Sequence, residues 1–260
     1  DSMPRAAIAT GMVDLVLPLG EMPAAILAFC TTHPRLPDGR GGRAPELDDP
    51  AVLGWLGRFL GRIHAIGAQK PFLQRPDLTI RSFGEEPRDE LLQSPFLPPE
   101  LRETWRSVID QALDGTRRCF ERAGKVPNIR LHGDVHGGNV LWTDSGPHFV
   151  DFDDARNGPA IQDLWMLLSG DAPAMARQLD YVLEGYEQFT DFNPASLHLV
   201  EALRTLRLIH YAGWIARRWD DPAFPAAFNW FDTPRYWQDM ILSLREQIAL
   251  MDESPLLRQF

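Results

Sequence analysis

The spacing of apolar residues along the chain predicts a mostly helical protein. In residues 50–67 the apolar positions share one helix face, namely Val52, Leu53, Leu56, Phe59, Leu60 and Ile63. Residues 99–123 form a second predicted helix, which prolines open and Gly124 closes. From Pro159 onward the pattern is helical almost throughout, and it predicts helices over 161–168, 172–189, 195–219 and 234–251.

Three short runs between these helical parts have the composition of β-strands. They cover 128–131, 139–142 and 148–152. Residues 144–147, Asp-Ser-Gly-Pro, predict a turn between the last two. Residues 31–49 are rich in Pro, Gly and Arg and predict a connector, while 70–98, with five prolines, predict mostly loop. A little strand inside a helical body indicates an α+β protein.

Length and composition exclude several classes of protein. A chain of 260 residues, 44% hydrophobic and 24% charged, is ordinary for a globular protein with one large domain or two small ones. No apolar run is long enough to span a bilayer, and the N-terminus lacks the pattern of a secretory signal. The two cysteines, Cys30 and Cys119, form no C-x-x-C pair. We therefore expect a cytoplasmic protein without a membrane partner.

The formal net charge of −10 argues against a nucleic-acid partner, because a phosphate backbone would be repelled overall. We expect none, and we expect a monomer.

The densest group of polar residues lies at 132–139, His-Gly-Asp-Val-His-Gly-Gly-Asn, and continues at 149–154, Phe-Val-Asp-Phe-Asp-Asp. Asp134 follows one predicted strand, and Asn139 opens the next. A hairpin would bring Asn139 beside Asp151, which lies near the end of the third predicted strand. An amide oxygen and a carboxylate are the hard ligands that Mg²⁺ prefers, together with phosphate oxygens and water. Asp134 is then placed to accept or orient the hydroxyl of a nucleophile.

This spacing is the pattern of phosphoryl transfer. A His-x-Asp-x-x-x-x-Asn segment followed about a dozen residues later by Asp-Phe is found in the catalytic and metal-binding loops of kinases. The reaction needs positioning and charge neutralisation, which one aspartate and an Asn/Asp pair provide. ATP and Mg²⁺ are therefore the expected cofactors.

The same residues resemble a known superfamily. His132 to Asn139, with Val150 to Asp153, are similar to the motifs of the aminoglycoside phosphotransferase and choline kinase superfamily, whose members have a protein-kinase-like fold of two lobes. Residues 56–64, 153–168 and 217–225 are similar to the bacterial stress response kinase A family. The resemblance covers about residue 41 to the end.

The resemblance implies a role for each matching residue. Asp134 resembles the catalytic base, and Asn139 and Asp151 resemble the magnesium ligands. Asp163 matches a buried aspartate that holds the catalytic loop, and we expect His132 to orient the same loop. The family implies an ATP-dependent serine/threonine protein kinase of the bacterial stress response, located in the cytoplasm.

Gly133 departs from the pattern of regulated protein kinases, which carry arginine at this position. Such an arginine pairs with a phosphorylated activation loop, so we expect no activation by that route.

The region before the catalytic lobe is short. No lysine precedes Lys70, and no G-x-G-x-x-G occurs, although a kinase small lobe uses both. We expect residues 1–40 to be a remnant of the N-terminal lobe, ending in a hinge with Cys30 and Thr31 as nucleotide-binding candidates, and 41–260 to be the catalytic lobe. Most of the small lobe is then missing from this sequence; the alternative is a fragment unable to hold ATP fully.

Simpler interpretations of the polar residues remain. Asp134, Asn139 and Asp151 are residue types common in turns and caps, although their combined spacing favours the kinase interpretation. His132 and His136 have the spacing of a zinc pair, but they lie on a predicted glycine-rich loop. Asp153 and Asp154 are solvated or supporting, with Arg156 paired to one of them. Arg207, Arg217 and Arg218 form a solvated ion-pair network or face an acidic substrate.

Three functions follow from these residues. We expect a Mg·ATP-dependent kinase acting on protein Ser or Thr. One alternative keeps the chemistry and changes the acceptor to a small-molecule alcohol such as an amino alcohol or aminoglycoside. The other is a non-catalytic nucleotide-binding regulator, which the missing small-lobe lysine supports.

Overall fold

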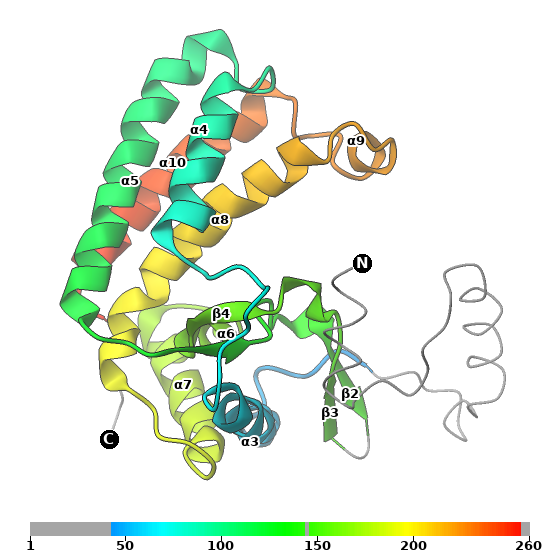
Figure 1. The fold of residues 1–260 in the computed structure, drawn as a ribbon, viewed down its shortest axis with the longest axis vertical. Helices are drawn as coiled ribbons and strands as arrows, with labels where there is room; N and C mark the ends of the chain where they lie inside the picture. Colours follow the sequence, from blue (N-terminus) through cyan, green and yellow to red (C-terminus); the bar gives the residue numbers. More distant parts are fainter. Residues whose placement is uncertain (1–42, 144–145, 256–260) are drawn as a thin grey trace, which may run out of the picture. The chain divides into compact units, whose positions relative to one another are not determined.

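A computed structural model describes residues 43–143 and 146–255 of the chain. All the elements below belong to one compact unit, Ala44–Phe260. The expected remnant of the small lobe, with Cys30 and Thr31, lies outside the described residues, so the division at residue 40 stays a prediction. Figure 1 shows a mostly helical body with a few short strands, as the α+β prediction requires.

The helices of the described part are the following: α3 (Pro50–Gly67), α4 (Glu86–Gln93), α5 (Arg102–Ala123), α6 (Ile161–Trp165), α7 (Ala172–Tyr186), α8 (Val200–Arg217), α9 (Ala223–Ala227) and α10 (Pro234–Asp252). Short helices of other types occur at Arg81–Glu85, Pro99–Leu101, Gly137–Asn139, Phe152–Asp154 and Pro194–Leu199. The predicted helix over 50–67 is confirmed residue for residue, with the side chain of Asp49 accepting from the Ala51 N–H at 2.8 Å as its N-cap.

The prediction of loop for 70–98 is wrong in its second half. A π-helical turn, Arg81–Glu85, leads directly into α4. Pro87 stands in the first turn of α4, where a missing N–H costs nothing, so this proline marks a helix start instead of excluding one. Only Pro87 and Leu91 of α4 are buried, so the sequence of this helix has no apolar periodicity from which it could be predicted.

The four strands in the described part of the chain form two separate antiparallel pairs. β1 (Asn128–Leu131) pairs with β4 (Arg156–Pro159), and β2 (Val140–Thr143) pairs with β3 (Gly146–Phe149). β4 was not predicted, because Arg-Asn-Gly-Pro has no apolar alternation; all four residues are nevertheless buried. The third predicted strand, 148–152, is displaced, since the observed strand ends at Phe149 and its first two residues, Gly146 and Pro147, were assigned to the turn.

Helices α3 and α7 pack backbone against backbone. A Cβ on Gly57 would lie 1.9 Å from the carbonyl oxygen of Val182, and one on Gly185 would lie 2.0 Å from that of Gly54. No side chain larger than hydrogen fits at either crossing point. The close contact fixes α3 relative to α7, and both helices carry residues that support the site described next.

Helices α4, α5, α8 and α10 lie side by side (Figure 1) and enclose the larger part of the core. Trp105 on α5 and Trp237 on α10 are fully buried and meet edge to face with ring centroids 6.0 Å apart. Within the described residues, no helix is both long and apolar enough to cross a membrane. The core thus holds α8 firmly, and α8 forms one wall of the candidate site.

Candidate active site

The loop after β1 carries the predicted catalytic aspartate. Gly133 has φ +90°, and a Cβ there would lie 2.3 Å from the carbonyl oxygen of Asp154, so only glycine fits before Asp134. The N–H of His136 donates to the carbonyl oxygen of Asp134 at 3.0 Å, and the N–H of Asn139 donates to that of His136 at 2.9 Å. These bonds close the loop into a compact turn that ends where β2 begins.

Asp134 and Asn139 are in direct contact. The Asn139 amide nitrogen donates to the carbonyl oxygen of Asp134 at 2.9 Å and to its Oδ2 at 3.2 Å. Asn139 is buried, and with its nitrogen turned toward Asp134 its amide oxygen faces the opposite way. The amide is therefore oriented as a cation ligand would need to be.

Asp151 stands next to Asn139 through the hairpin. The N–H of Val150 donates to the carbonyl oxygen of Asn139 at 3.1 Å, extending the β2–β3 pairing by one residue. Asp151 follows in a left-handed conformation, φ 62° and ψ 69°, and is the single non-glycine residue with positive φ in the described part. Its side chain is exposed. Backbone strain of this kind concentrates at functional sites.

Asp163 holds the loop from behind. Its Oδ2 accepts from the backbone N–H of His132 at 2.9 Å, and its Oδ1 accepts from that of Gly133 at 2.8 Å. The side chain is completely buried, 0% exposed. The two oxygens thus fix the backbone immediately before Asp134.

Two residues outside the predicted site extend this support: His64, which the sequence indicated as structural, and Tyr186, which it did not indicate. His64 on α3 lies with Nε2 3.0 Å from Asp163 Oδ2, and its Nδ1 lies 2.9 Å from the hydroxyl of Tyr186 on α7. Burial, and then the negative charge of Asp163, raise the pKa of Tyr186 well above its usual value, so the hydroxyl keeps its proton. The catalytic loop is therefore tied to α6, α3 and α7 in turn.

His132 is held in one tautomer. Its Nδ1 accepts from the N–H of Asp134 at 3.3 Å, so Nε2 carries the proton and donates to the carbonyl oxygen of Val150 at 2.9 Å. The ring also packs against Phe152, with centroids 4.6 Å apart. His132 thus connects the segment around Asp134 to the segment around Asp151.

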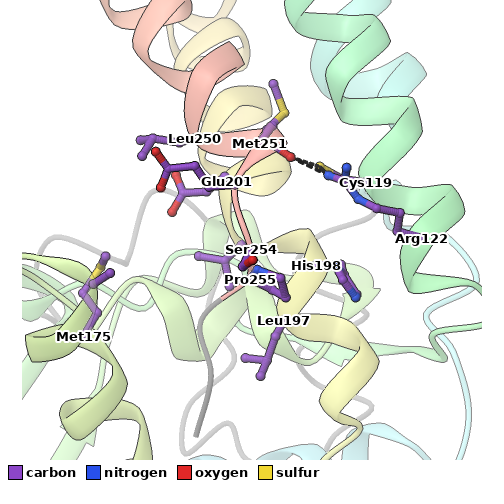
Figure 2. Close-up of a pocket in the computed structure, with 13 residues that line it drawn as sticks. Cys119, Arg122, Met175, Leu197, His198, Glu201, Leu250, Met251, Ser254 and Pro255 are labelled. Carbon is purple, nitrogen blue, oxygen red and sulfur yellow. Dashed lines mark hydrogen bonds between the residues drawn. The ribbon is translucent and has the colours of Figure 1, made fainter.

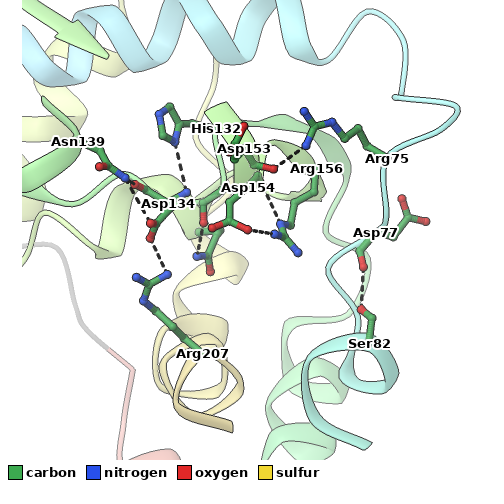
Figure 3. A network of polar contacts seen from close by, with 12 residues as sticks. Arg75, Asp77, Ser82, His132, Asp134, Asn139, Asp153, Asp154, Arg156 and Arg207 are labelled. Atoms are coloured by element: carbon green, nitrogen blue, oxygen red, sulfur yellow. Dashed lines mark hydrogen bonds and ion pairs between the residues drawn. The ribbon is translucent and has the colours of Figure 1, made fainter. Parts of the chain in front are cut away.

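Arg207 on α8 contacts Asp134, which the sequence did not predict. Its Nη1 lies 2.6 Å from Asp134 Oδ1 and forms an ion pair with the predicted base (Figure 3). His136 also faces Asp134, with Nε2 3.6 Å from Oδ2. The sequence indicated Arg207 as part of a solvated ion-pair network or as a residue facing an acidic substrate, and nothing in the pattern related it to Asp134.

The neighbouring charges are paired as well. Arg156 bonds the carboxylate of Asp154, as expected, and its guanidinium lies over the ring of Phe83 at 4.6 Å. His210, three residues after Arg207 on α8, stacks on the same Phe83 with centroids 3.9 Å apart. Burial, and then the nearby cations Arg156, Arg217 and Arg207, lower the pKa of His210 to about 4 against the opposing charge of Asp154. This histidine is neutral at physiological pH.

Two cavities lie away from this cluster. A cavity of about 70 Å³ between the ends of α5, α8 and α10 is lined by Cys119, Glu201 and Met251 among others (Figure 2). A groove of about 550 Å³ is lined by Leu78, Arg117 and neighbouring residues. Neither is lined by the predicted site residues.

Across 43–143 and 146–255, no three side chains of His, Cys, Asp or Glu come together in a way that would hold a metal ion. A site formed by one amide and one carboxylate instead needs nucleotide phosphates and water to complete a magnesium shell.

Known proteins match this chain in sequence and in fold. A profile of the phosphotransferase enzyme family matches residues 13–200. The chain belongs to this family. Stress response kinase A of Salmonella choleraesuis is 40% identical over 244 residues, which are 94% of this chain and 74% of that protein. Serine/threonine protein kinase RdoA of Salmonella typhimurium has the same identity and coverage. The protein is therefore a kinase, and the resemblance seen in the motifs is confirmed.

Solved structures confirm the kinase-like fold. Amicoumacin kinase hAmiN aligns with a TM-score of 0.57 at 20% identity, over 83% of this chain and 63% of that one. Choline kinase LicA from Streptococcus pneumoniae aligns with a TM-score of 0.56 at 15% identity, over 77% and 64%. The chain spans less than two thirds of both proteins, and at these identities the likeness concerns the fold alone.

Proposed function

We propose that this kinase transfers the γ-phosphoryl group of Mg·ATP to the hydroxyl of Ser or Thr in a protein substrate. The observation that supports it best is the hydrogen-bonded cluster of Asp134 and Asn139, with Asp151 next in the paired hairpin. Phosphoryl transfer requires these groups at one point: a carboxylate for the nucleophile and oxygen ligands for the metal.

Each residue has a distinct task in this proposal. The Asn139 amide oxygen and the Asp151 carboxylate would hold Mg²⁺, since both are hard oxygen donors and the Asn139 nitrogen is already turned away toward Asp134. Bound Mg²⁺ would neutralise charge on the transferred phosphate. Asp134 orients the acceptor hydroxyl and receives its proton. Asp163, through its bonds to His132 and Gly133, keeps Asp134 in place.

A protein acceptor is favoured by the Salmonella typhimurium relative, which is named a serine/threonine protein kinase and is 40% identical over most of this chain. The names of the other relatives suggest a role in the stress response. A cytoplasmic location, a monomeric state and the absence of a nucleic-acid partner belong to the same proposal.

The test is transfer of labelled γ-phosphate from ATP to a generic protein substrate. It compares the native protein with Asp134→Ala, Asp151→Ala and, as a control, Asp239→Ala, whose carboxylate pairs with Arg235 on the surface of α10. We expect transfer that requires Mg²⁺, falls by about 10² or more in Asp134→Ala, and is unchanged in the control.

Transfer that survives in Asp134→Ala and Asp151→Ala would refute the assigned roles. If the native protein binds Mg·ATP but phosphorylates only small alcohols, the acceptor class is wrong. Binding of Mg·ATP without transfer to any acceptor would make the protein a nucleotide-binding regulator.

A further inference from the structure

Both carboxylate oxygens of Asp134 have a neighbouring donor or cation, although Oδ1 is buried beside Arg207 without a well-directed hydrogen bond. Oδ2 accepts from the Asn139 amide nitrogen at 3.2 Å and faces His136. Oδ1 lies 2.6 Å from Arg207 Nη1. An acceptor hydroxyl that approaches Asp134 must therefore replace Arg207 at Oδ1 or share the oxygen with it.

Arg207 is accessible to such an acceptor. Its side chain is 35% exposed, while that of Asp134 is 15% exposed, so the guanidinium is the more open partner. Figure 3 shows it reaching from α8 toward the loop that carries Asp134. A guanidinium has five donors in a planar fork, and one carboxylate oxygen uses few of them. The remaining donors can bind a second anion without a change of fold.

The surrounding charges oppose a cationic acceptor. Two acids near α8 are already matched: Asp154 by Arg156, and Glu90 by Arg217. Burial is the main cause of the depressed pKa of His210, three residues along α8, and the cations Arg156, Arg217 and Arg207 lower it further against Asp154. The α8 wall thus places the partly exposed guanidinium of Arg207 beside Asp134, whereas an amino alcohol would need acidic groups there.

We propose that Arg207 selects acceptors that carry an anionic group beside the reacting hydroxyl, such as a Ser or Thr flanked by acidic residues. The inference rests on the proposed function and specifies its substrate class. The anion binds the guanidinium in a forked, charge-assisted contact, and Oδ1 of Asp134 becomes free for the hydroxyl. An acceptor with an ammonium group at that position meets Arg207 and is rejected by repulsion.

The chemical step itself is unchanged. The acceptor oxygen bonds the γ-phosphorus as the bond to the β,γ-bridging oxygen breaks, ADP leaves, and the hydroxyl proton passes to Asp134. Arg207 takes no part in these bonds and acts as a specificity-determining residue.

Two matched acceptor series test the proposal in the full-length protein. One is a set of serine peptides with Asp, Ala or Lys on both sides of the serine. The other is glycerate, glycerol and 3-aminopropane-1,2-diol, which share a diol and differ in charge. We expect kcat/KM to favour the anionic member of the accepted series over the neutral member by about tenfold or more, the smallest effect of one charged hydrogen bond.

Three variants distinguish a loss of acceptor specificity from a non-specific loss of activity. Arg207→Gln removes the fork and should abolish the preference for anionic acceptors, mainly through KM, while Arg207→Lys should restore part of it. Arg235→Gln, which removes one positive charge from the surface of α10, should retain the full preference. Equal preference in the native protein and Arg207→Gln would overturn the proposal, as would a native preference for cationic acceptors.

A readout that needs no turnover keeps this test distinct from that of the proposed function. Ligand-observed NMR measures binding of glycerate and 3-aminopropane-1,2-diol to the native protein and to Arg207→Gln. If peptides are not phosphorylated, the protein-acceptor proposal fails, but stronger glycerate binding that is lost in Arg207→Gln still supports selection by Arg207. Equal binding of both compounds refutes it.

Discussion

Replacing Asp163 tests how strongly the loop before Asp134 depends on one buried carboxylate. Asp163→Ala removes the acceptor of three donors: the backbone N–H groups of His132 and Gly133 and the ring of His64. Asp163→Asn keeps the shape but turns an NH₂ group toward at least one of these donors. Both variants leave polar groups buried without partners, since Asp163 and His64 are almost completely excluded from solvent.

The expected cost follows from these three contacts. Hydrogen bonds to a charged group contribute about 1.5–3 kcal/mol each, but the contributions are not additive, and breaking a buried charged network costs about 3–5 kcal/mol. We take about 4 kcal/mol for Asp163→Ala. For a domain of this size each kcal/mol lowers Tm by about 2–4 °C, so the expected decrease is about 8–16 °C. This is a large part of the total stability of an ordinary domain.

Urea and thermal unfolding, followed by circular dichroism, measure the effect. Asp239→Asn is the matched control, because Asp239 is an exposed aspartate whose pair with Arg235 contributes little. At a temperature where Asp163→Ala is still folded, we also expect phosphoryl transfer to fall, since the backbone before Asp134 is no longer held. A loss of stability below about 1 kcal/mol in Asp163→Ala would show that the carboxylate does not hold the loop.

Two further predictions concern stability. The folded-state pKa of His210, about 4, lies below its unfolded value, so the unfolded chain binds the extra proton as pH falls. The free energy of unfolding should therefore decrease by about 1 kcal/mol between pH 7 and 5.5. In His210→Phe the urea midpoint should depend less on pH over this range than in the native protein. The same pH dependence of the urea midpoint in both proteins would contradict the lowered pKa of His210. Gly57→Ala should destabilise by more than about 2 kcal/mol, because its Cβ meets the Val182 backbone at 1.9 Å, whereas Gly54→Ala, whose Cβ has 3.8 Å to its nearest contact, should be neutral or stabilising in the same unfolding assay.

The parts of the fold that the sequence predicted are those with a strong local signal. The helix over 50–67 has an apolar face, an Asp cap and a proline in its first turn, and its bounds were correct. β4 has none of these, since it is stabilised by pairing with β1 and by the packing of Arg156 against Phe83. A strand that depends on long-range partners cannot be recognised from its own composition.

The candidate site divides in the same way. Asp134, Asn139 and Asp151 lie within one short stretch whose spacing carries the kinase pattern, so their proximity could be predicted. Arg207 lies on a helix far along the chain, and nothing in the sequence distinguishes it from the many other arginines. The positions of His64 and Tyr186 could not be predicted from the sequence either, because only the glycine-mediated packing of α3 on α7 brings these residues behind the loop.

The chain order of these supports has a consequence for synthesis in the cell. The loop with Asp134 is synthesised before Asp163, Tyr186 and Arg207, although those later residues contact or support it. Domains form as units during translation, and a nascent chain that ends before α8 lacks part of the scaffold. An incomplete polypeptide that ends before α8 thus carries Asp134, Asn139 and Asp151 without the contact that Arg207 makes with Asp134.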